Sequence, residues 1–307
     1  MSNFHGYNKK KCFFEGWYFK HQIGNDTISF IPGVSVGMDG NKIAFIQVVT
    51  KEVAYDIHYS YGDFNISEDK LNITIGKNTF SEEGISIDIE ERDLTIKGVV
   101  KYTGLTPIDY DIMGPFSKLP FMECNHGIIS LYHKLRGSIK INDKEISLEN
   151  GIGYIEKDWG KSFPRSYIWL QCNDFKEGKS SIMLSIADIP FLGMRFRGCI
   201  AVVYYNGMEH RLATYNGAKI LRAEENGIIL GRKKERLEVD IIKKSSQTLV
   251  APIRGAMSRN IREHFGCSAT FKFYIEGRLE FTLRSENCSF EYVKDERVKI
   301  KEEDWNL

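Results

Sequence analysis

The residues best suited to chemistry lie in one segment, residues 151–172, which reads GIGYIEKDWGKSFPRSYIWLQC. It places three consecutive charged residues, from Glu156 to Asp158, between two large rings, Tyr154 and Trp159. Charged groups bordered by apolar rings are either paired or partly removed from water, and an acid removed from water holds its proton more tightly. The segment therefore predicts a site for acid chemistry.

Two other stretches have a similar character. Residues 12–21, CFFEGWYFKH, set Glu15 within a group of five aromatic residues that includes Trp17. Residues 121–137, FMECNHGIISLYHKLRG, carry a glutamate and two histidines. The three stretches lie far apart in the sequence, so any shared site must be assembled by the fold.

Three carboxylates are the candidate catalytic acids: Asp158, Glu156 and Glu15. Glu156 lies two residues from Asp158, so the two share a face of an extended chain, and such close carboxylates tend to hold one proton between them. Asp158 has a structural alternative, an ion pair with Lys157 or Arg165. For Glu15 the alternative is an ion pair across a domain interface.

Glu123, His126 and His133 raise the alternative of a metal site. The glycine after His126 disfavours a helical E-x-x-H arrangement, and a spacing of seven residues puts the two histidines on opposite faces of a strand. We therefore predict no metal, and one of these histidines as a proton relay or as a structural residue. The sequence has no glycine-rich nucleotide motif and no G-x-S-x-G elbow, so we expect neither a cofactor nor serine hydrolysis.

The composition bounds the class of protein. The chain has 307 residues, 42% of them hydrophobic, and a formal net charge of +1. This balance argues against a dedicated nucleic-acid binder, and the apolar content is sufficient for a large core. No apolar stretch reaches the ~18 residues of a membrane-spanning helix, and no signal peptide is evident. The six cysteines are scattered without a C-x-x-C pair, which is typical of reduced thiols, and we expect a cytoplasmic location.

The hydrophobic pattern predicts an all-β protein. Apolar residues alternate with polar ones over residues 71–75, 85–89 and 271–283, and Asn-Gly or similar turn pairs separate strand-sized runs. Short helical turns are expected only near residues 115–125 and 254–264. Two blocks each open on an aromatic strand, which predicts an N-terminal β domain over residues 1–150 and a C-terminal one over 151–307.

The sequence also resembles a known family. FFEGWYFK near the N-terminus, GPFSKLPFMECNHGIISLYHKLRGSIKIN in the middle and GYIEKDWGKSFPRSYIWLQCN just after it are similar to motifs of the tocopherol cyclase-like family, which is distantly related to the carotenoid hydratases. The resemblance implies two lipocalin-like antiparallel β-barrel or sandwich domains packed together. It further implies an interdomain pocket for a hydrophobic small molecule, a prenyl quinol or another isoprenoid, and chemistry on a carbon–carbon double bond without metal or cofactor.

This chemistry requires an acid to protonate an alkene, aromatic faces to stabilise the resulting cation, and a dry pocket. The acid-initiated step ends in cyclisation or in hydration. The candidate substrate-binding residues are aromatic or able to hold an oxygen or an acid: Trp17, Trp159, Arg165, Trp169, His126 and Tyr154.

A second hypothesis is a non-catalytic carrier of lipids or isoprenoids, since barrels of this type often only bind. A carrier requires apolar walls, whereas an enzyme requires an acid in contact with the pocket. Peripheral membrane contact for substrate pickup is left open under both hypotheses. An interaction scaffold is a third and weaker alternative.

Overall fold

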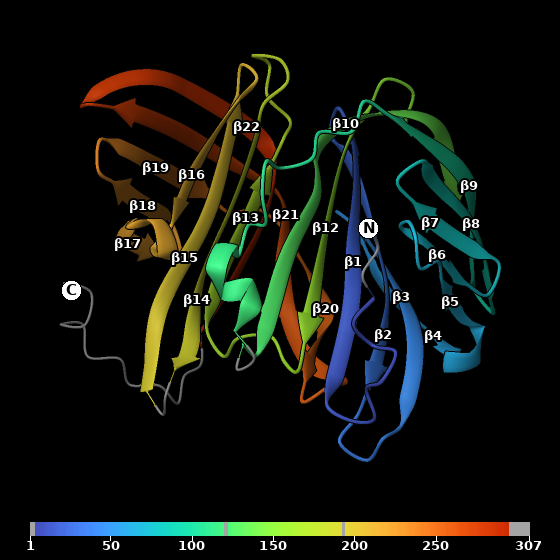
Figure 1. The fold of residues 1–307 in the computed structure, drawn as a ribbon. Coiled ribbons are helices and arrows are strands. Elements are labelled where there is room, and N and C mark those ends of the chain that lie inside the picture. Colours follow the sequence, from blue (N-terminus) through green and yellow to red (C-terminus); the bar gives the residue numbers. More distant parts are fainter. Residues whose placement is uncertain (1–3, 120–121, 192–193, 295–307) are drawn as a thin grey trace. The chain divides into compact units, whose positions relative to one another are not determined.

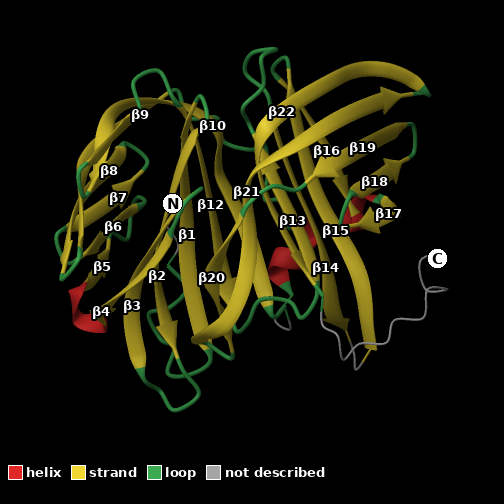
Figure 2. Cartoon of the chain, turned by 180° about the vertical axis from the view of Figure 1, so that it is seen from behind, coloured by secondary structure: helices red, strands yellow, loops and turns green. Residues whose placement is uncertain are grey.

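The structure, a computed structural model, describes residues 4–119, 122–191 and 194–294, and their regular elements are β-strands apart from three short helices (Figures 1 and 2). The strands pair antiparallel in two sheets. The predicted all-β class is confirmed.

The first sheet has twelve strands in the order β4-β3-β2-β1-β12-β10-β9-β8-β7-β6-β5, with β11 paired to β10. Their bounds are β1 (Phe13–Ile23), β2 (Asp26–Val36), β3 (Lys42–Thr50), β4 (Ala54–Ser60), β5 (Phe64–Ile66), β6 (Asn72–Ile75), β7 (Asn78–Ser81), β8 (Gly84–Glu91), β9 (Leu94–Thr103), β10 (Cys124–Ile141), β11 (Lys144–Ser147) and β12 (Ile152–Gly160).

The second sheet has ten strands in the order β16-β15-β14-β13-β22-β21-β19-β18-β17, with β20 paired to β21. Their bounds are β13 (Tyr167–Cys172), β14 (Ser181–Phe191), β15 (Met194–Tyr205), β16 (Met208–Ala213), β17 (Lys219–Glu224), β18 (Gly227–Arg232), β19 (Glu235–Ile242), β20 (Ser246–Ile253), β21 (Ala256–Ile275) and β22 (Arg278–Val293). Three short 3₁₀ helices complete the described elements: η1 (Tyr61–Asp63), η2 (Gly114–Lys118) and η3 (Thr214–Asn216).

The chain folds into two compact units. The first comprises the described parts of Met1–Ile108, Cys124–Phe163 and Leu249–Asn260, and the second those of Asp109–Glu123, Pro164–Thr248 and Ile261–Leu307. The sequence-based boundary after residue 150 separates β12 from β1 and β10, the strands that it pairs with in the first sheet. The domain ranges 1–150 and 151–307 therefore differ from these units, and as a division into folding domains they stay a prediction.

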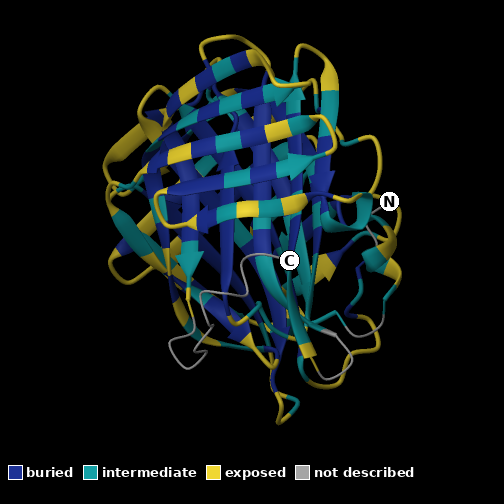
Figure 3. Cartoon of the chain, turned by 90° about the vertical axis from the view of Figure 1, so that its left-hand side faces the viewer, coloured by how far each residue is buried: buried dark blue, intermediate teal, exposed yellow. Residues whose placement is uncertain are grey.

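Each unit has its own apolar core, formed by the alternating residues that point inward from its strands (Figure 3). Strand β9 illustrates the pattern, because Leu94, Ile96 and Val100 are buried while Thr95, Lys97 and Val99 between them are exposed. This is the period of two that the sequence predicts for a half-buried strand.

The predicted turns are confirmed where both central residues take positive φ. Asn206 and Gly207 do so between β15 and β16, with φ of 50° and 79°, and Glu276 and Gly277 do so between β21 and β22. The helical turn expected near residues 115–125 is found in part, as η2. The one expected near residues 254–264 is wrong, because a turn at Arg254 leads directly into the long strand β21, whose apolar residues alternate.

Within the described residues, no helix is long and apolar enough to cross a membrane.

Candidate active site

Strand β12 lies at the centre of the candidate site, between β1 and β10 in the first sheet. Asp158 stands opposite His126 of β10, and Glu156 stands opposite Tyr18 of β1. Because residues directly opposite each other in an antiparallel pair share a face, these four side chains lie on one side of the sheet. The prediction that Glu156 and Asp158 share a face is confirmed.

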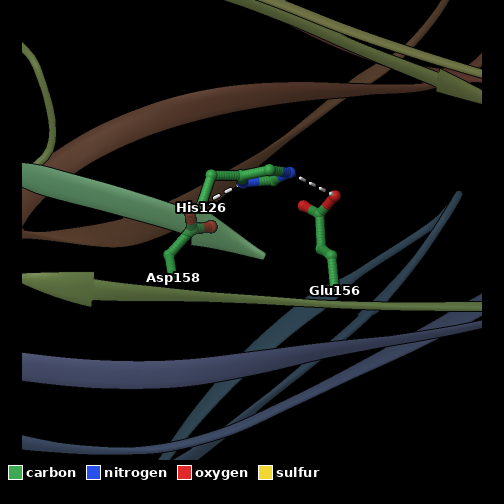
Figure 4. Close-up of side chains that lie close together, drawn as sticks. All are labelled: His126, Glu156 and Asp158. Carbon is green, nitrogen blue, oxygen red and sulfur yellow. Dashed lines mark hydrogen bonds and ion pairs between the residues drawn. The ribbon is translucent and has the colours of Figure 1, made fainter. Parts of the chain in front are cut away.

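His126 lies between the two carboxylates and links them (Figure 4). Its Nδ1 is 2.8 Å from Oδ1 of Asp158, a hydrogen-bonding distance. Its Nε2 is 3.3 Å from Oε2 of Glu156, an ion-pair separation without the alignment of a hydrogen bond. We call these three residues the His126 cluster.

The surroundings of His126 favour a proton on its ring. Burial alone would lower the pKa of His126, but the charges of Asp158 and Glu156, together with the hydrogen bond to Asp158, raise the pKa well above its usual value. The contacts with the two carboxylates thus favour the protonated form of the imidazole.

The two carboxylates differ in their surroundings. The side chain of Asp158 is 23% exposed, whereas that of Glu156 is 5% exposed. The fully buried Tyr154 donates its hydroxyl hydrogen to Oε2 of Glu156 over 2.5 Å. Glu156 is thus held from two sides, and Asp158 is the carboxylate that another molecule can reach.

Glu15 lies on the opposite face of the same sheet. It stands opposite Trp159, and its Oε1 is 3.0 Å from Nζ of Lys157. The ring and the backbone N–H of His5 also contact the Glu15 carboxylate, at 3.1 and 2.8 Å. Glu15 therefore forms an ion pair, as the structural alternative for this residue predicts, but its partner lies in the same unit. Lys157, an alternative partner for Asp158, pairs with Glu15 instead.

Two of the predicted substrate-binding tryptophans share that opposite face. The ammonium of Lys157 lies 5.8 Å from the ring centre of Trp17 and 4.8 Å from that of Trp159. Trp17 is buried in the core, and Trp159 stacks on His5. The alternation of β1 and β12 thus separates both rings from the His126 cluster, and their role in substrate binding stays a prediction.

The other predicted site residues belong to the second unit. Arg165 is exposed in the segment before β13, and Trp169 is buried within that strand. Glu123 pairs with Arg195 at 3.4 Å. The suggested trio of Glu123, His126 and His133 is not brought together, because each member has different neighbours.

His133 lies on the opposite face from His126, as predicted. It stands opposite Gly153, after two irregularities in the pairing of β10 with β12. Its Nδ1 is 3.0 Å from the hydroxyl of Ser130, and its ring lies 4.4 Å from that of Tyr102. Burial, with a smaller contribution from the nearby His21, lowers the pKa of His133 to about 3.

Among the described residues, the His126 cluster is the only group of three histidine, cysteine or carboxylate side chains that could hold a metal ion. Its ligand atoms all lie within 4.8 Å of one another. The two carboxylates approach different nitrogens of the imidazole ring, so one ion could not take all three groups without rearrangement. The observed arrangement is one carboxylate at each ring nitrogen of His126.

Sequence reasoning named all three members of the cluster but not the link between them. It assigned His126 to substrate binding or to a proton relay, whereas the structure places it between the two candidate acids. The even spacing of Glu156 and Asp158 was a usable signal for their shared face. The pairing of β10 with β12, which brings in His126, leaves no local mark in the sequence.

The chain thus has two antiparallel β units and a cluster in which a buried histidine lies between two carboxylates. Comparisons with known proteins agree with this fold. A model of the tocopherol cyclase-like family matches residues 81–188, a range that contains the whole cluster. The probable chloroplastic tocopherol cyclase of Oryza sativa subsp. japonica and the chloroplastic tocopherol cyclase of Zea mays are each 32% identical over 74 residues. Those residues are 24% of this chain and 16% of each plant protein, so the chain matches only a small part of their length. The resemblance to this family is confirmed.

Solved structures are similar over most of the chain. CghA in complex with Sch210972 has a TM-score of 0.58 at 10% identity, covering 92% of this chain and 88% of CghA. Kievitone hydratase from Nectria haematococca has a TM-score of 0.52 at 13% identity, covering 91% and 88%. A putative AttH from Nitrosomonas europaea has the same TM-score and identity, covering 91% and 93%. At these identities the similarity concerns the fold alone, and the predicted fold class is confirmed.

Proposed function

We propose that the protein is a cofactor-independent cyclase or hydratase that acts on an isoprenoid or prenylated hydrophobic substrate. The observation that carries the proposal is the His126 cluster, a buried imidazolium between two carboxylates. The tocopherol cyclase-like match over residues 81–188 supports the type of reaction, because it spans all three residues.

The proposed reaction begins at Asp158, the more exposed carboxylate. His126 passes a proton from Nδ1 to Asp158, which protonates one carbon of an alkene and leaves a tertiary cation on the other. A phenol oxygen of the same substrate, or a water, captures the cation and releases a proton that returns to the cluster. Cyclisation is then an isomerisation and hydration adds one water, so neither requires an electron acceptor or donor.

The cluster is suited to this task because it keeps a proton and a proton acceptor together. Glu156, held by Tyr154, balances the imidazolium while Asp158 is transiently neutral. In a water-poor site these charges act at short range and strongly. Glu15 is the second candidate for the acid, because it pairs with Lys157 on the opposite face of the sheet.

The test compares Asp158→Asn and Glu156→Gln with the wild type, using phytylated and geranylgeranylated quinols as substrates. A general acid is worth ~10²–10⁴ in rate, so we expect at least one variant to lose that much turnover while substrate binding stays within about tenfold. Asp188→Asn is the matched control, because Asp188 also forms a 2.8 Å ion pair, with Arg195, in the second unit.

Turnover is measured per folded molecule, alongside the melting temperature of each sample. Normal turnover in both variants would exclude these carboxylates as the acid and direct attention to Glu15. Tight binding of the quinols with no turnover by the wild type would instead favour the carrier hypothesis.

A further inference from the structure

We infer that Tyr154 is a positioning residue that keeps the shared proton of the cluster on His126 rather than on Glu156. The inference rests on the proposed function, because it assigns a role inside the same site. It gives Tyr154 a different task from the substrate contact that the sequence analysis predicts.

The geometry of the hydroxyl carries the first step. Tyr154 is fully buried, and its hydroxyl oxygen lies 2.5 Å from Oε2 of Glu156. Burial, and after it the charge of Glu156, raises the pKa of Tyr154 well above its usual value, so the hydroxyl keeps its hydrogen. Tyr154 therefore donates its hydroxyl hydrogen to Oε2 of Glu156.

The second step is competition for the same carboxylate. Oε2 of Glu156 receives the Tyr154 hydroxyl and also faces Nε2 of His126 at 3.3 Å. A hydrogen bond donated to a carboxylate stabilises its ionised form. With the donor in place, the ion pair of imidazolium and carboxylate is favoured over a neutral imidazole beside a protonated acid.

Other polar groups share this face of the sheet. From β1, Tyr18 stands opposite Glu156 and has its hydroxyl 3.0 Å from that of Ser29, and the buried Lys20 stands opposite Tyr154. From β12 itself, Asp158 contacts the other nitrogen of His126. The hydroxyl of Tyr154 thus acts on Glu156 directly, through a short hydrogen bond to the oxygen that faces His126.

Loss of the hydroxyl in Tyr154→Phe should therefore move the proton. Hydrogen bonds to charged groups contribute enough to shift the partition of the proton toward Glu156 by roughly 10- to 100-fold. Asp158 would then be recharged from a neutral imidazole, and we expect kcat to fall by a similar factor while KM changes less than about twofold.

The decisive experiment records the ring nitrogens of His126 by NMR on protein labelled with ¹⁵N-histidine, at pH 7 and without substrate. In the wild type we expect both nitrogens to be protonated. In Tyr154→Phe we expect Nδ1 to stay protonated and Nε2 to become unprotonated. The His126 signals are identified by their loss in His126→Gln.

Tyr167→Phe is the matched control, because Tyr167 donates to Glu291 over the same 2.5 Å in the second unit. It should leave the His126 signals unchanged. Identical His126 signals in Tyr154→Phe and the wild type would overturn the inference.

If Tyr154→Phe does not fold, site-specific replacement of Tyr154 by 3-fluorotyrosine decides, because it keeps the ring and makes the hydroxyl a stronger donor to Glu156. Both His126 nitrogens protonated then supports the inference, and an unprotonated Nε2 overturns it. The spectra need no substrate, so they test the role of Tyr154 even if no quinol is turned over and the proposed reaction fails.

Discussion

His126 and His133 lie on the same strand, β10, seven residues apart, and have opposite electrostatic characters. The carboxylates of Asp158 and Glu156 raise the pKa of His126 well above its usual value, whereas burial lowers that of His133 to about 3. Both side chains are buried, so burial alone does not explain the difference.

The difference comes from the two faces of the sheet. On one face, two acids from β12 compensate the cost of burying a charged imidazole. On the other face, His133 is surrounded by Ser130, Tyr102 and apolar core residues, and His21 nearby adds no compensating negative charge. A histidine at neutral pH is thus a charged proton donor on one side of this sheet and a neutral core residue on the other.

Replacing each histidine in turn should give the largest contrast. His126→Gln removes the proton link between Glu156 and Asp158, and turnover should fall by ~10²–10⁴. His133→Gln removes a neutral ring from the core, so turnover per folded molecule should stay near that of the wild type. Steady-state turnover with a prenylated quinol, corrected for the folded fraction, measures both. Full activity in His126→Gln would break the proposed division between the two faces.

The pH dependence of stability should have opposite signs for the two sites. His21 and His133 have folded-state pKa values lowered to about 4 and about 3, so their stabilisation is present above ~6.5 and is lost as the pH falls toward those values. The pKa of His126 is raised, so its stabilisation is complete below ~6.5 and is lost as the pH rises through the folded-state pKa.

Urea denaturation at pH 6.5 and pH 5.5 tests the predicted contribution of the two lowered histidines. Between these pH values His126 should change the free energy of unfolding only slightly. Each lowered histidine should cost about 1 kcal/mol of unfolding free energy between these two pH values. His133→Gln should therefore lose about 1 kcal/mol less than the wild type over the same step. An equal loss in both proteins would mean that His133 is not neutral in the folded state.

Adding a methyl group beside His133 and, for comparison, opposite Asp158 should sharpen the comparison with a smaller effect. A Cβ at Gly153 would lie 2.1 Å from Nε2 of the buried His133, so Gly153→Ala should lower stability by ~1–3 kcal/mol. A Cβ at Gly16, opposite Asp158, would meet its nearest atoms only at 3.8–4.0 Å, so Gly16→Ala should cost less. Equilibrium denaturation of both variants decides, and equal stability losses would contradict the tight packing of His133.

Part of this site follows from local sequence. A spacing of two residues places Glu156 and Asp158 on one face of any strand, and a spacing of seven places His126 and His133 on opposite faces. The first prediction depends only on the period of an extended chain, and the second holds because the two irregularities of β10 between the histidines offset each other. The helical turn expected near residues 254–264 failed because the apolar residues of β21 follow the strand period there.

The sequence by itself determined the residue types of the site, the β period that orients them and the family resemblance. The tertiary structure decided which of them meet. The face on which Glu15 lies depends on the register of β1 against β12, because a shift of one residue would exchange the two faces. The sequence alone therefore does not place Glu15 apart from the other two acids. Likewise, His126 becomes a charged group only because β10 pairs with β12 and sets it between two acids. Such pairings join segments far apart in the chain, and their energies depend on the whole sheet rather than on any local pattern.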